Sequence, residues 1–175
     1  MSLILFSILI ENVSLFSQFA IILSFTRFKG LMKNVSNIIA WTSVDEQIHA
    51  NAGIYLVNKI REEFPEMFNE DTQNEIVTLV KKSIDIETKI VDWIFSQGEI
   101  DIINKEDLIT FMKYRVDDSM RKIGMPALYN ISAEAYKPMV WFEEEVFANS
   151  LDDFFAKRPV DYTKHDKSIS AVDLF

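Results

Sequence analysis

Cysteine is absent from the chain, which excludes disulfides, thiolate zinc sites, iron–sulfur clusters and cysteine nucleophiles. Glycine and proline are scarce, at four residues each, so the sequence carries few turn signals. Its 175 residues are enough to bury one substantial core, and 49% of them are hydrophobic. This balance argues against disorder and predicts one all-helical globular domain.

A basic surface is also lacking. The formal net charge is −9, and the lysines and arginines do not gather into a stripe that could hold phosphates. We therefore expect no nucleic-acid partner. The lack of cysteine makes a cytoplasmic location the default expectation.

Charged side chains are almost missing from the start of the chain, where Glu11 is the only one before Arg27. The apolar run over residues 1–25 has the hydropathy of a signal peptide or a membrane span, but it lacks the basic first region of a secretory signal. A span would place Glu11 near the middle of the bilayer, where a carboxylate is costly. We expect a buried core helix, with a membrane span as the alternative. Burying Glu11 requires a partner, and a metal cation is one such partner.

Apolar residues at helical spacing predict four long helices. Their expected ranges are residues 2–29, 37–63, 71–97 and 105–123, followed by Gly30, Pro65, Gly98 and Gly124. The first is apolar on most sides, which suits the centre of a bundle. The second is expected to begin after Asn34 or Ser36, which are both good N-cap types.

The rest of the chain has a weaker helical pattern. Residues 128–155 are expected to form short helical pieces. Residues 158–175 hold too few apolar side chains for a core, which predicts a flexible tail after a domain over residues 1–157.

The second predicted helix carries Glu46 and His49, three residues apart and therefore on one face. A carboxylate and an imidazole at that spacing can bind one cation. In four-helix di-iron carboxylate proteins, two helices each supply a Glu-x-x-His pair and two others each supply one carboxylate. The alternative is a surface helix on which both side chains face water. The apolar neighbours Ile38, Ile39 and Ile48 and the isolated Glu11 favour the metal site.

Straight helices would bring Glu11 and Glu46 only roughly level. If the first two helices form an antiparallel hairpin, a rise of 1.5 Å per residue leaves a mismatch of roughly 5 to 12 Å. A tilt, or a bulge in the first helix, would be needed to close it. Such bulges often occur at functional sites.

Several segments together resemble the radical-generating small subunit of class I ribonucleotide reductase. They are Glu11–Phe19, Asp45–His49, Val91–Phe95, Asp153–Tyr162 and Ser168–Phe175. The resemblance covers nearly the whole chain but corresponds only to the C-terminal half of that family. It implies an incomplete ferritin-like helical bundle. It also implies that the chain is part of an enzyme complex that reduces ribonucleotides to deoxyribonucleotides.

The resemblance also implies roles for individual residues. Glu11, Glu46 and His49 would be ligands of a dinuclear iron or manganese–iron centre. Asp45 would link a metal-bound histidine to the radical-transfer chain. From the residues alone, Asp45 could equally be a solvated helix residue.

Three further roles follow from the same resemblance. Phe16 and Phe19 would line the apolar pocket around a tyrosyl radical, and Tyr162 would pass the radical to the large subunit. The C-terminal residues would dock into that large subunit; they are Ser170, Ala171, Val172, Asp173, Leu174 and Phe175. From the residues alone, the two phenylalanines could be plain core packing and Tyr162 a tail residue.

The family's first half supplies a second Glu-x-x-His pair, another carboxylate and the radical tyrosine, and this chain does not contain them. It has two histidines, and His165 has no Glu three residues before it. The expected partners are a separately encoded N-terminal half, a second copy of the completed small subunit, and the large subunit. Val44 stands where many members carry a basic residue.

Two alternatives come from other functional classes. One is an inactive fragment that acts only as a helical interaction protein, and the other is a small membrane-anchored protein. The sequence leaves open the metal pair and the choice between diphosphate and triphosphate substrates.

Overall fold

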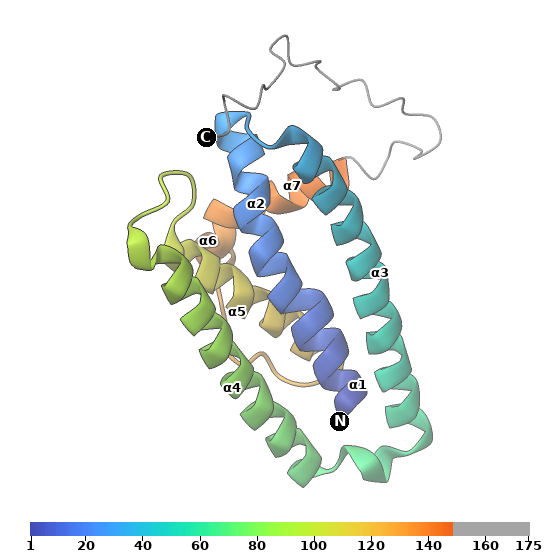
Figure 1. Cartoon of the computed structure of the whole chain (residues 1–175). Coiled ribbons are helices and arrows are strands. Elements are labelled where there is room, and N and C mark those ends of the chain that lie inside the picture. The colour runs from blue at the N-terminus through green and yellow to red at the C-terminus, as the bar shows by residue number, and fades with distance from the viewer. Residues whose placement is uncertain (149–175) are drawn as a thin grey trace, which may run out of the picture.

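A computed structural model describes residues 1–148, and this part of the chain is helical throughout its regular structure (Figure 1). The α-helices are α1 (Ser2–Leu5), α2 (Leu15–Lys29), α3 (Lys33–Glu63), α4 (Glu70–Ile94), α5 (Lys105–Lys122), α6 (Ala133–Tyr136) and α7 (Val140–Ala148). A π-helix, Phe6–Ser14, joins α1 to α2 and is called the π segment below. Short 3₁₀ turns lie at Pro65–Phe68, Phe95–Gln97 and Lys137–Met139.

The first helix, formed by α1, the π segment and α2, occupies the middle of the bundle. It lies between α3 and α4 with α5 behind it (Figure 1). Ile8, Phe16 and Leu23 are fully buried along it. By length and composition it could cross a membrane, yet 61% of its most apolar window is buried inside the protein. The expectation of a buried core helix is confirmed.

Small side chains on α3 let it approach the first helix closely. The buried ones are Ser36, Ala40, Ser43, Ala50 and Gly53. At Gly53 a Cβ atom would collide with the side chain of Ser7 in the π segment. The close approach of α3 to the first helix therefore depends on glycine at position 53, which has no side chain.

Gly53→Ala should lower the free energy of unfolding by about 1 to 3 kcal/mol, because overpacking outweighs the better helix propensity of alanine. Urea denaturation measures the change. Combining Gly53→Ala with Ser7→Gly moves the small residue to the opposite helix, so this double variant should unfold near the wild-type midpoint. A single variant more stable than the wild type would contradict this packing.

The predicted boundaries of the later helices are confirmed to within a few residues, and the caps explain why. Asn69 accepts a hydrogen bond from the Thr72 amide (2.9 Å) at the start of α4. Asn104 does the same for Glu106 (2.8 Å) at the start of α5. Such side chains satisfy amides that the first turn leaves unpaired.

The predicted start of the second helix is wrong. Helix α3 begins at Lys33, directly after Met32, which has a left-handed backbone (φ 59°). Ser36 is inside the helix and buried, and its hydroxyl is hydrogen-bonded to Thr26 on α2 (2.5 Å). A tertiary contact therefore uses the hydroxyl that sequence analysis had assigned to capping.

A buried carboxylate holds the segment after α5. Asp117 is fully buried and accepts hydrogen bonds from the amides of Leu128 (2.8 Å), Tyr129 (2.7 Å) and Ile131 (2.8 Å). This tether leads the chain into α6 and α7, where Phe142 packs on Phe16. The predicted boundary between a domain over 1–157 and a tail over 158–175 lies outside the described residues.

Candidate metal centre

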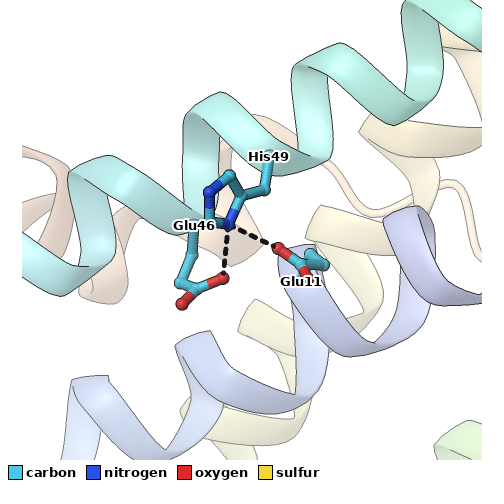
Figure 2. Close-up of side chains that lie close together, drawn as sticks. All are labelled: Glu11, Glu46 and His49. Carbon is cyan, nitrogen blue, oxygen red and sulfur yellow. Dashed lines mark hydrogen bonds and ion pairs between the residues drawn. The ribbon is translucent and has the colours of Figure 1, made fainter.

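Three side chains converge where the π segment passes α3 (Figure 2). Glu11 comes from the π segment, and Glu46 and His49 come from adjacent turns of α3. One ligand atom from each lies within 4.8 Å of the others. His49 Nδ1 is 3.3 Å from Glu11 Oε2 and 3.3 Å from Glu46 Oε2. The structure thus brings together the three ligands predicted from the sequence.

The π segment explains how Glu11 reaches α3. Its nine residues hydrogen-bond from i to i+5, which puts more residues into each turn than an α-helix does. This changes both the height and the direction at which Glu11 leaves the helix. The sequence predicted that a tilt or a bulge was needed here, and the helix has the bulge.

Burial and charge make the site favourable for a cation. The side chains of Glu11 and Glu46 are 10% and 18% exposed, whereas that of His49 is 61% exposed. Burial raises the pKa of Glu11, and the neighbouring Glu46 carboxyl raises it further. The hydrogen bond to Glu46 raises the pKa of His49. The Oε2 atom of Glu11 is buried, and its partner in the structure is the His49 imidazole, which balances its charge only when protonated.

These observations fit a divalent metal ion. Two carboxylates close together in a buried place repel one another, and a cation between them would offset that repulsion. Carboxylate and imidazole ligands suit iron and manganese. The three residues could provide ligands for one such ion.

An arginine beside the site was missed by sequence analysis. Arg115 on α5 donates from Nε to the Asn12 carbonyl (2.5 Å) and from Nη2 to Asn12 Oδ1 (2.5 Å) and Gln47 Oε1 (3.0 Å). Its guanidinium lies over the Phe16 ring, 3.8 Å from the centroid. Burial lowers its pKa to about 10, so it stays charged at neutral pH. A basic residue in an amphipathic helix gives no sequence signal that it is buried.

The other predicted site residues are placed as follows. Asp45 is exposed on α3, with no hydrogen bond or ion pair to another residue in the part of the chain that the structure describes. Phe16 is fully buried and Phe19 nearly so, with ring centroids 5.8 Å apart. Tyr162, His165 and Ser170–Phe175 lie outside the described residues.

Comparison with known proteins gives the family. The family model described as ribonucleotide reductase, small chain, matches residues 1–138. The chain belongs to the ribonucleotide reductase small-chain family. The predicted resemblance is confirmed.

Individual relatives of this reductase family agree. The chain is 30% identical over 161 residues to a probable ribonucleoside-diphosphate reductase small subunit of Invertebrate iridescent virus 3, covering 91% of this chain and 42% of that protein. It is 29% identical over 155 residues to the ribonucleoside-diphosphate reductase subunit beta of Chlamydia pneumoniae, covering 89% of this chain and 43% of that one. The chain therefore spans less than half the length of these relatives.

A solved structure of a class I ribonucleotide reductase from Bacillus halodurans has the same fold. Its TM-score is 0.70 at 26% sequence identity, over 77% of this chain and 42% of that one. The predicted all-α, ferritin-like architecture is confirmed.

Proposed function

We propose that this chain is the C-terminal portion of a ribonucleotide reductase small subunit, and that Glu11, Glu46 and His49 hold one metal of its dinuclear centre. The observation that carries the proposal is the convergence of these three side chains in a member of the reductase small-chain family. When bound, a di-iron or manganese–iron centre supplies oxygen activation and a one-electron oxidant. The completed enzyme would reduce ribonucleotides to deoxyribonucleotides.

The chain's own residues would prepare the site for that chemistry. Glu11 and Glu46 would offset the charge of a divalent ion from two helices, and His49 would add a neutral nitrogen ligand. The aromatic packing of Phe16 on Phe19 and Phe142 keeps water from the buried side of the π segment. A dry wall limits side reactions of a strong oxidant.

The other half of the site must come from residues that this chain does not have. Within residues 1–148, Glu11, Glu46 and His49 are the one cluster with metal-ligand geometry. The outward side of α3 is where we expect the missing portion to dock. Ile38, Ile48 and Tyr55 are exposed there at spacings that share one helix face with Asp45. Asp45 would then meet a metal-bound histidine of that portion.

Two roles for residues outside the described part, the assembly of the small subunit and the aromatic pocket belong to the same proposal. Tyr162 would carry the radical toward the large subunit, and Ser170–Phe175 would bind that subunit. The completed small subunit would form a homodimer in the cytoplasm. Phe16 and Phe19 would shield the radical tyrosine of the missing portion.

Coexpression tests the half-site directly. The full chain should be produced alone and together with a polypeptide that carries the second Glu-x-x-His pair and its tyrosine. Alone it should bind at most one iron, and weakly, because three ligands cannot hold two metals firmly. The complex should hold two irons and show a tyrosyl radical signal by electron paramagnetic resonance.

A matched control is the same complex with Glu46→Ala and His49→Ala. It should assemble but lose its second iron and the radical. If the isolated chain takes up two irons and shows a tyrosyl radical, the half-site proposal is wrong. If the double variant retains full iron and radical, the chain is only an interaction protein.

A further inference from the structure

Arg115 connects the residues that directly follow the two carboxylate ligands. Asn12 follows Glu11 on the π segment, and Gln47 follows Glu46 on α3. One nitrogen of Arg115, Nη2, bonds to both of these side chains, at 2.5 Å and 3.0 Å. A single guanidinium from α5 thus joins the two helices that carry the candidate ligands.

This arginine is expensive to bury and forms no direct ion pair within residues 1–148, although the lowering of its pKa by burial is partly offset by the charges of Glu143 and Asp118. It is 6% exposed, and no carboxylate lies within salt-bridge distance in residues 1–148. Its charge is met by the neutral oxygens of Asn12 and Gln47 and by the face of the Phe16 ring. A buried charge with only neutral partners is a weak choice for stability alone. The planar fork of a guanidinium is, however, well suited to fixing two groups in one geometry.

The direction of the contacts also matters. Successive side chains on an α-helix point about 100° apart, so a bond to Gln47 leaves the neighbouring Glu46 free to face elsewhere. The same holds for Asn12 and Glu11 in the wider turns of the π segment. Arg115 therefore hydrogen-bonds to both helices that carry candidate ligands, from the core side, without bonding to the side chains of Glu11, Glu46 or His49.

Several hydrogen bonds from α5 hold the π segment at Asn12. Arg115 Nε binds the Asn12 carbonyl, Nη2 binds its side-chain oxygen, and Asn12 Nδ2 donates to Ser119 one turn further along α5 (2.5 Å). A long π-helix is rare, since its hydrogen bonds compete with the ordinary i to i+4 pattern. If the segment returned to that pattern, Glu11 would move away from Glu46.

We propose that Arg115 is the positioning residue of the metal centre, setting the register of Glu11 against Glu46 by clamping the π segment to α3. The metal part of this inference rests on the proposed function, whereas the clamp itself concerns the protein without metal. The clamp keeps the two carboxylates at the separation that a shared cation needs.

The test compares Arg115→Met with Arg61→Met in the full chain. Arg61 is a matched control on α3: it also donates to a backbone carbonyl, that of Ile123, and its guanidinium lies 5.7 Å from the Phe68 ring centroid. Two readouts are taken from each protein. Visible absorption of added Co²⁺ gives metal affinity, and amide hydrogen exchange over Phe6–Ser14 gives the order of the π segment without metal.

Arg115→Met should weaken Co²⁺ binding about tenfold, as loss of a supporting neighbour typically does. It should also speed amide exchange in the π segment. Arg61→Met should change neither, even where urea denaturation shows a similar loss of stability. Gln47→Met removes only the α3 contact, so it should weaken Co²⁺ binding several-fold and leave exchange in the π segment unchanged.

If Arg115→Met fails to fold, Arg115→Lys replaces it, because lysine keeps the charge but cannot bridge Asn12 and Gln47 as a fork. Unchanged exchange and Co²⁺ affinity in the Arg115 variant would overturn the clamp. If the unmodified chain binds no Co²⁺, the metal proposal fails instead. Amide exchange alone then decides the clamp, with faster exchange in the π segment supporting it and equal exchange overturning it.

Discussion

Replacing Glu11 with glutamine should abolish metal binding and, in the same protein, raise the free energy of unfolding of the metal-free chain. Glutamine has nearly the same shape but cannot supply the negative charge that a divalent ion requires. Supporting residues around a metal are worth about ten- to a hundredfold in affinity, so loss of a direct ligand should cost at least about a hundredfold.

The gain in stability has a separate physical cause. Burial and the nearby Glu46 carboxyl raise the pKa of Glu11, which means that ionising this carboxyl is less favourable in the folded chain than in the unfolded one. A neutral amide removes that penalty. Residues kept for function often reduce stability in this way.

Glu62→Gln is the control, because Glu62 is also on α3 but is exposed and paired with Lys59 (2.6 Å). It should leave Co²⁺ affinity unchanged and shift the urea midpoint little. Titration with Co²⁺ and urea denaturation of the metal-free proteins measure both effects. A Glu11→Gln protein that binds Co²⁺ like the wild type would remove Glu11 from the ligand set.

The largest loss of stability is expected from Asp117→Ala. Three backbone amides, those of Leu128, Tyr129 and Ile131, donate to this buried carboxylate. An unpaired buried amide costs about 1 to 3 kcal/mol, and these three amides are partly buried, so the variant should lose about 3 kcal/mol. The effect should reach α7, because the same segment leads to Phe142 in the core.

The adjacent Asp118 provides a matched control. It is half exposed and pairs with Lys122 (2.7 Å) one turn away, so Asp118→Ala should cost about 0.5 kcal/mol or less. Urea denaturation of the two variants gives the comparison. Equal losses would mean that the three amides find other acceptors when Asp117 is removed.

The helices and the pairing of Glu46 with His49 on one face were largely predictable, because both depend on local spacing. Apolar residues such as Ile76, Val80 and Ile84 recur every turn of α4, and all three are buried. Glu46 and His49 are three residues apart, so predicting a helix was enough to predict that they share one face. The family resemblance placed Glu11 with them, and the structure brings all three together.

The features that could not be predicted from the sequence depend on tertiary contacts. A π-helix differs from an α-helix by one residue in each hydrogen-bonded turn, and composition does not reveal which pattern packing will select. The burial of Arg115 was hidden in the same way, since its helix also carries exposed basic residues such as Arg121. The start of α3 was missed because Ser36 bonds to Thr26 rather than capping. The roles of Phe16, Phe19, Asp45 and Tyr162 stay predictions.

The clamp has a consequence for the order of folding. The helices that bear Glu11 and Glu46 adjoin in the sequence, so the loop that closes them is short and inexpensive in chain entropy. Arg115 lies 103 residues after Asn12, and its contacts can form only when a much larger loop has closed. The three ligands should therefore meet early and loosely as a hairpin, and their final spacing should be fixed at a later step, when α5 packs.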